Sequence, residues 1–193
     1  MNENCNPSDI IAMAMQSISK IAEGASAHGR YHFALYEYEG GPIVREWDQD
    51  NVVCTEGKNL ALNTYLSGSA YTVTGPYLGL ISSSSYSAVS AADTMASHSG
   101  WLEAGNAHAP TYSGTRPVAA FSSASAGSIS LSASLAYTFT GSGTVQGAFM
   151  TFGAGAVGTI DSTAGALYSA GAFASAQPVI SGNVLSVSYT TSL

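Results

Sequence analysis

The glycine run at residues 153–158 is the segment whose residue types and spacing most closely match a known chemical motif. Gly153, Gly155 and Gly158 follow the spacing G-x-G-x-x-G, in which glycines let the backbone approach the phosphates of a dinucleotide. That function also requires a helix opening at the third glycine and an acidic residue about 20 positions further on. Asp161 is the last acidic residue and the segment after the motif is rich in turn residues. We therefore expect a flexible loop and no nucleotide cofactor.

The other residues that could carry catalysis or bind a metal lack the spacing that these functions need. The four histidines are scattered: His28, His32, His98 and His108. His98 is close in sequence to Asp93 and Glu103, but the three do not follow a metal-ligand spacing. Serines are so numerous that some Ser/His/Asp combination is expected by count alone. We expect a protein that is not an enzyme and that holds neither a metal nor a cofactor.

Two tryptophans are the residues best suited to recognition. Trp101 stands in a loop-rich region with Tyr112, where exposed aromatic rings could bind a sugar or a protein partner. A packing role in the core is the competing interpretation and the one we favour for Trp101, which we also keep as a candidate partner contact. Trp47 ends a predicted hairpin strand, and with Tyr36 on the other strand it makes this hairpin a candidate contact element.

Residues 1–29 are predicted to form an N-terminal arm that carries a short amphipathic helix. Ile11, Met15, Ile18 and Ala22 recur at helical spacing, after a possible N-terminal cap at residues 7–9 and before Gly24. No second helix of similar strength follows. The apolar face of the arm therefore needs either the β domain or another subunit to cover it, and Ile11, Met15 and Ile18 are candidate partner contacts.

The segment from residue 30 to residue 193 is predicted to be one all-β domain. Strands are expected at residues 31–35, 43–47, 52–54, 76–81, 129–140, 144–152 and 185–189, with turns at 40–42, 48–51 and 141–143. Residues 58–66 are predicted as a short helix with Leu62, Tyr65 and Leu66 on one side, and residues 90–98 as a helical turn. Short strands at near-regular spacing favour a β-sandwich, which we expect to be jelly-roll-like.

Charge is concentrated in the first 116 residues of the chain. Only 9% of the residues are charged, the net charge is −7, and from residue 117 onward Asp161 is the only charged residue. No basic stripe is present for nucleic-acid phosphates, and no run approaches the roughly 20 apolar residues of a membrane span. Charge-poor faces favour a homo-oligomer, a dimer or trimer. The acidic start before residues 10–15 does not resemble a secretion signal, so Cys5 and Cys54 are expected to be free thiols. A disulfide between them, within or between chains, is the alternative.

Several short segments resemble a family of small virion proteins of tailed bacteriophages. The resemblance lies in residues 59–63, 77–81, 92–98 with Gly100, Trp101 and Glu103, 147–149, 167–173 and 185–189. It covers about residues 30–193, and the stretch from Asp93 to Trp101 carries most of it. The arm is where this chain departs from the family.

The resemblance implies a virion component. Within the virion, a small, acidic, all-β protein made in the host cytoplasm best fits a capsid decoration, or cement, protein. Its partners would be the major capsid protein and further copies of itself, with no nucleic acid and no membrane. The alternative is a tail- or fibre-associated protein with a receptor-recognition role, in which Trp101 and Tyr112 would line a glycan site.

Overall fold

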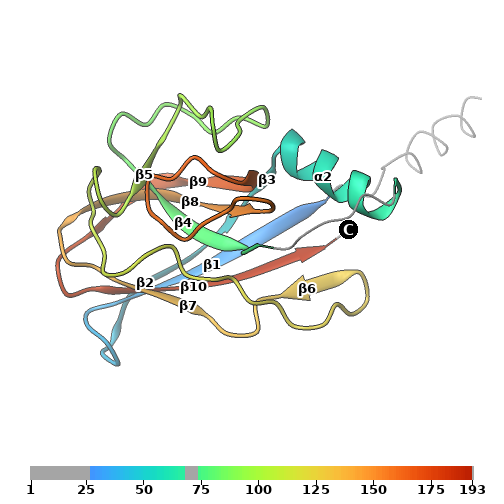
Figure 1. Ribbon diagram of the computed structural model, residues 1–193. Coiled ribbons are helices and arrows are strands. Elements are labelled where there is room, and N and C mark those ends of the chain that lie inside the picture. The colour runs from blue at the N-terminus through green and yellow to red at the C-terminus, as the bar shows by residue number, and fades with distance from the viewer. Residues whose placement is uncertain (1–26, 68–73, 193) are drawn as a thin grey trace, which may run out of the picture.

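The computed structural model describes residues 27–67 and 74–192, and Figure 1 shows two antiparallel sheets that face each other. The first sheet has the order β2-β1-β10-β6, and β7 also pairs with β10. Its strands are β1 (His28–Tyr36), β2 (Ile43–Asp50), β6 (Ser128–Ser130), β7 (Leu135–Thr138) and β10 (Val184–Ser192). The second sheet has the order β3-β9-β8-β4-β5. Its strands are β3 (Val52–Val53), β4 (Tyr77–Ser82), β5 (Leu102–Ala104), β8 (Gly143–Phe152) and β9 (Ala166–Val179).

The main core lies between the two sheets and follows from residue alternation along β1 and β10. Tyr31, Phe33 and Leu35 of β1 point inward and are at most 2% exposed, whereas Arg30 and His32, which alternate with the first of them, are exposed. Each large apolar side chain buried in this way stabilises the fold by about 1.5–3 kcal/mol. Because one face of the first sheet is solvated, its sequence alternates clearly, and the predicted strands at 31–35 and 185–189 are confirmed.

Buried tyrosines join the two sheets through their hydroxyl groups. The Tyr31 hydroxyl on β1 lies 3.3 Å from the Ser169 hydroxyl on β9. The Tyr137 hydroxyl on β7 donates a 2.8 Å hydrogen bond to the carbonyl oxygen of Leu78 on β4. These bonds satisfy the polar end of each ring, which allows large amphipathic side chains to fill the space between the sheets.

The second sheet is covered on both faces. Its outer face packs against residues 83–101, which form a layer of loops over β4, β8 and β9 (Figure 1). This second cluster contains Ile81, Met95, Trp101 and Phe149, all at most 1% exposed. Covering on both faces explains why the predicted strand at 144–152 has apolar residues on both sides rather than an alternation.

Helix α2 (Thr55–Tyr65) lies against β9 through its first turn. The Glu56 carboxylate accepts a 2.7 Å hydrogen bond from the backbone N–H of Leu167. A Cβ atom at Gly57 would come within 2.6 Å of the Tyr168 carbonyl oxygen, so only glycine permits this approach. The predicted helix is confirmed, although Leu62 and Leu66 on its predicted apolar side are exposed.

Three predicted elements differ from the observed ones. Residues 48–50 belong to strand β2 rather than to a turn. Residues 90–98 form turns rather than a helix, although the Asp93 carboxylate accepts the hydrogen bond from the Ser90 N–H that a helix cap would use. The predicted strand at 129–140 is interrupted between β6 and β7. Residues 131–134 of this segment face only residues 188–189 of β10, so the surplus residues bulge out of the strand pairing.

The all-β sandwich is confirmed, whereas the strand order does not confirm a jelly roll. Strand β1 begins at His28, two residues before the predicted domain boundary at residue 30. The predicted arm contacts Ile11, Met15 and Ile18, and Cys5, lie outside the described residues.

Candidate interaction surfaces

The β1–β2 and β9–β10 turns lie side by side at one end of the sandwich (left in Figure 1), and four residues in or next to these turns have exposed apolar side chains. This hairpin-end patch consists of Tyr38, Ile43, Val44 and Ile180, which are 57%, 50%, 55% and 62% exposed. Exposed apolar side chains that gather in one place are typical of a contact surface, whereas isolated ones are common on any protein.

A β-bulge at the edge of the first sheet creates half of this patch. Leu35 pairs with Arg45 and Tyr36 pairs with Ile43, so Val44 is the extra residue between these two pairs. A bulge breaks the strict alternation of faces, and as a result two consecutive apolar residues are both exposed. It also makes the edge strand β2 less suitable for sheet-to-sheet aggregation.

Backbone and amide hydrogen bonds hold the two turns of the patch together. The Asn183 side chain donates a 2.9 Å bond to the Glu37 carbonyl and accepts a 2.9 Å bond from the Ile180 N–H. The Tyr38 ring packs over Gly41, where an added Cβ would come within 2.9 Å of it. The patch is therefore preorganised, which lowers the entropy cost of binding.

The predicted contact residues of the hairpin stand next to the patch rather than in it. Tyr36 ends β1 and is half-buried. The Trp47 ring is also half-buried, stacks on Phe33 with centroids 5.3 Å apart, and meets the edge of Phe173. Its indole nitrogen is buried without a hydrogen-bond partner. Trp47 therefore fixes β2 onto the core, and its role as a partner contact stays a prediction.

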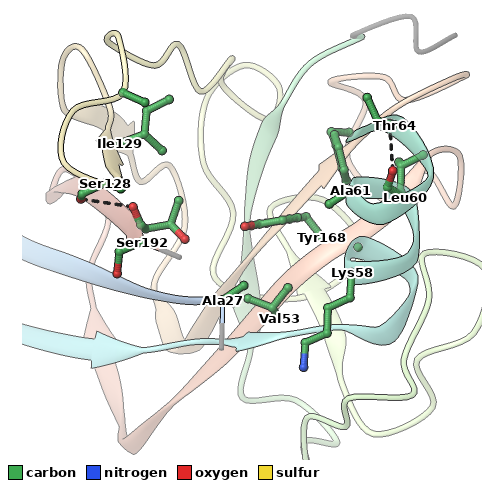
Figure 2. Close-up of a pocket in the computed structure, with 15 residues that line it drawn as sticks. Ala27, Val53, Lys58, Leu60, Ala61, Thr64, Ser128, Ile129, Tyr168 and Ser192 are labelled. Atoms are coloured by element: carbon green, nitrogen blue, oxygen red, sulfur yellow. Dashed lines mark hydrogen bonds between the residues drawn. The ribbon is translucent and has the colours of Figure 1, made fainter. Parts of the chain in front are cut away.

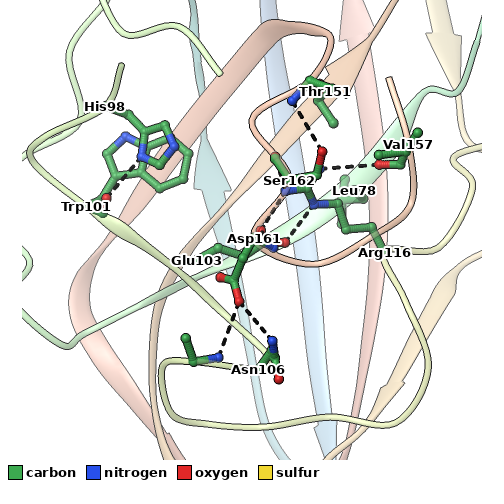
Figure 3. Close-up of polar contacts among 12 residues, drawn as sticks. Leu78, His98, Trp101, Glu103, Asn106, Arg116, Thr151, Val157, Asp161 and Ser162 are labelled. Carbon is green, nitrogen blue, oxygen red and sulfur yellow. Dashed lines mark hydrogen bonds and ion pairs between the residues drawn. The ribbon is translucent and has the colours of Figure 1, made fainter. Parts of the chain in front are cut away.

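Trp101 is fully buried, which corrects its place among the predicted surface contacts. Its indole N–H donates a 2.9 Å bond to Asp93, and its ring stacks on His98 with centroids 3.9 Å apart (Figure 3). Tyr112 is only 5% exposed. The interpretation of Trp101 as a packing residue is confirmed, and the pair does not form an exposed aromatic surface.

A group of charged side chains covers the solvent face of β1 and β2. The Asp48 carboxylate contacts both Arg30, at 2.9 Å, and the Nδ1 atom of His32, at 2.8 Å, and Glu46 reaches the Nε2 atom of His32 at 3.0 Å. The hydrogen bond to Asp48 raises the pKa of His32, and the bond from Arg30 lowers the pKa of Asp48. We call Arg30, His32, Glu46, Asp48 and Asp50 the hairpin ion cluster.

A buried ion pair, missed by the sequence analysis, holds the glycine-rich loop in place (Figure 3). Arg116 and Glu103 are 1% and 5% exposed and form two hydrogen bonds of 2.7 and 2.6 Å. Arg116 also donates to the carbonyl oxygens of Val157 and Ser162, and Glu103 accepts from the N–H of Asp161. Burial raises the pKa of Glu103, which the guanidinium opposes by favouring the carboxylate.

A loop at residues 153–158 is confirmed, because no helix opens at Gly158, whereas its flexibility stays a prediction and the bond from Arg116 to Val157 ties the loop to the domain. The Gly158 carbonyl instead accepts a 2.7 Å bond from the backbone N–H of Arg116. Gly153 and Gly155 adopt φ angles of +94° and +81°, so these glycines serve turns.

An apolar pocket of about 660 Å³ opens at the end of the sandwich opposite the hairpin-end patch. Figure 2 shows Leu60, Ala61 and Thr64 of α2 on one side, Ser128 and Ile129 on the other, and Tyr168 between them. Ala27, the first described residue, and Val53 complete one wall. We call this cavity the end pocket.

Cys54 is a free thiol, as predicted, and burial raises its pKa to about 11. Within residues 27–67 and 74–192, no three His, Cys, Asp or Glu side chains are grouped to hold a metal ion. No helix in the same ranges has the length and apolar character needed to cross a bilayer.

Comparison of the chain with protein-family models, with curated proteins and with solved structures finds no match.

Proposed function

We propose that this chain is a structural protein of a bacteriophage virion, which binds the outer surface of the capsid as a decoration protein and bridges major capsid subunits. The hairpin-end patch is the observation that carries this proposal, since it presents four exposed apolar side chains on a rigid end of the sandwich. The proposal also rests on the resemblance of residues 30–193 to small phage virion proteins.

The chemistry of the patch suits a protein partner rather than a small ligand. It projects from two turns, whereas small molecules are bound in concave sites. Its neighbours Glu37 and Glu39 supply the polar rim that surrounds many protein interfaces. Many identical, modest contacts to a repetitive shell give strong attachment through multivalency.

The tail- or fibre-associated alternative has less support from the structure. It placed a glycan site at Trp101 and Tyr112, and both rings are buried. Copy number separates the two functions. A decoration protein is present in proportion to the major capsid protein, and a tail component in a small number set by tail symmetry.

The proposal is tested by measuring the occupancy of purified particles by variants of the chain. We expect Ile43→Asp to lower the apparent affinity for particles at least about tenfold, because a charge would be buried at the interface. Val52→Asp is the matched control, since Val52 on β3 is 43% exposed, lies outside the patch and belongs to no proposed contact. The proposal would be refuted if both variants bound particles equally well. It would also be refuted if the particle held only the small number of copies that tail symmetry sets.

A further inference from the structure

The end pocket has no role in the proposed function, and the way the chain enters the sandwich indicates what fills it. Ala27 lines the pocket, and β1 begins at the next residue. The 26 residues before Ala27 are therefore attached directly to the pocket wall. We propose that the apolar face of residues 10–22 of the same chain occupies the end pocket.

The distance from the pocket to this face is short. Between Ala22 and Ala27 the chain can span at most about 18 Å, so the apolar face begins within that distance of the wall. A tether of this length gives an effective concentration in the millimolar range, which favours the chain's own pocket over that of a neighbour.

The size and lining of the pocket match a row of side chains from one helix face. Its volume of about 660 Å³ is that of a typical ligand pocket and is too small for an entire helix. Ile11, Met15, Ile18 and Ala22 would enter it, while the polar residues of the arm stay in solvent.

Two of the hydroxyl groups that line the pocket already have partners within the domain, which suits an apolar occupant. Thr64 donates to the Leu60 carbonyl at 2.9 Å, and Ser128 donates to the Thr191 carbonyl at 3.2 Å. An apolar occupant therefore leaves neither hydroxyl without a hydrogen bond. At the rim, the exposed Lys58 can meet Glu23, which is four residues from Ala27.

This assignment goes beyond the proposed function and changes the role expected of the arm. Ile11, Met15 and Ile18 would contact the β domain of their own chain, which was one of the two alternatives for the arm, and would not contact the capsid. The hairpin-end patch remains the contact with the particle.

Disulfide trapping in the full-length protein tests the assignment. In a Cys5→Ser background, Ile18→Cys or Met15→Cys is combined with Ala61→Cys, whose side chain lines the pocket. The matched control replaces Ala61→Cys with Leu62→Cys, at the neighbouring position, which is 55% exposed and not part of the pocket lining. Under mild oxidation we expect at least one Ala61→Cys pair to cross-link within a single chain, about tenfold more than with Leu62→Cys.

Two outcomes of the trapping experiment overturn the proposal. Equal cross-linking at positions 61 and 62 would mean that the arm does not enter the pocket. A cross-link only between chains, seen as a dimer on a non-reducing gel, would mean that a second copy supplies the arm.

Thermal unfolding gives a second measurement that needs no cross-link. Met15→Ser removes a methionine from the apolar face, and Met13→Ser removes one from a different side of the predicted helix. We expect Met15→Ser to lower the melting temperature by about 2–4 °C more than Met13→Ser does. Equal melting temperatures would contradict docking. Both measurements use isolated protein without particles. A negative result would therefore reject docking of the arm without bearing on the proposed binding to the capsid.

Discussion

Arg116 shows at the scale of one residue how a chain with few charges uses them. Its guanidinium bridges Glu103 and two carbonyl oxygens from residues 157 and 162, and it lies 5.2 Å from the centre of the Phe149 ring. A loop without regular structure is thereby fixed to the second sheet. Burying a charge pair is costly, and the hydrogen bonds around this pair offset much of that cost.

Breaking the buried pair should therefore destabilise the protein strongly. We expect Glu103→Gln to lower the free energy of unfolding by about 3–5 kcal/mol, because Arg116 would stay buried without a counter-charge. The double variant Glu103→Leu/Arg116→Met should lose much less, because no charge is then left unpaired. Urea denaturation measures all three proteins. A Glu103→Gln protein as stable as the parent would show that the pair is not coupled to folding.

At the scale of the element, the β1–β2 hairpin has two different faces. Its inner residues, including Phe33, Leu35 and half-buried Trp47, fill the core, and its outer face carries the hairpin ion cluster. Asp48 lies opposite His32 in the strand register, which brings the two side chains together on one face. These cross-strand pairs explain why the polar residues 48–50 continue a strand instead of forming a turn.

The stability of this hairpin should depend on pH. Because the pKa of His32 is raised in the folded protein, protonated His32 contributes fully to the stability of the hairpin below about pH 6.5. This contribution is lost as the pH rises through the pKa that His32 has in the folded state. Because the pKa of Asp48 is lowered in the folded protein, ionised Asp48 contributes to the stability of the hairpin above about pH 3.8. This contribution is lost as the pH falls through the pKa that Asp48 has in the folded state. The cluster therefore stabilises the hairpin most between about pH 4 and 6.5. The effect is small because the side chains are exposed and screened.

Titration of the His32 ring by NMR measures this effect directly. Asp48→Asn should lower the pKa of His32 toward its ordinary value of about 6.5. Asp50→Asn is the matched control, because Asp50 contacts Arg30, at 3.6 Å, and has no bond to His32. A His32 pKa that is the same in both variants would contradict the role of Asp48.

Sequence patterns predicted the elements that have one buried and one solvated face. Strands β1 and β10 alternate clearly and were predicted, whereas the 14-residue strand β9 was not. Its small residues, with Gly171 among them, give no alternation, and its register against β8 is interrupted twice. Residues 90–98 were mistaken for a helical turn because Ser90 and Asp93 have the types and spacing of a helix cap. The same hydrogen bond between them forms here in a non-helical turn.

The candidate surfaces were less predictable, because distant segments form them. The hairpin was identified as a contact element, but Val44 is exposed only because of a bulge, and Ile180 comes from another turn. Arg116 ends the charged part of the sequence, but nothing near it in sequence indicates that it is buried against Glu103. The end pocket combines α2, β6 and Ala27, which are brought together only by the fold.

At the scale of the whole molecule, the two ends of the sandwich carry different surfaces. The hairpin-end patch lies at one end, and the end pocket with the start of β1 lies at the other (Figure 1). A protein built in this way can fix its own arm at one end while the other end remains available for a partner.

Exposed apolar residues outside the hairpin-end patch should make contacts between copies of the chain. Such residues occur at Leu62, Leu66, Val118 and Val157, and Asp161 is the only charged residue in the segment 117–193. Weakly charged surfaces with apolar side chains favour association. Sedimentation velocity at micromolar concentration should therefore show a dimer or trimer, and the Ile43→Asp variant should keep this state while losing affinity for particles. A protein that stays monomeric at every micromolar concentration would contradict the oligomer, and dissociation by Ile43→Asp alone would place the subunit contact at the hairpin-end patch instead.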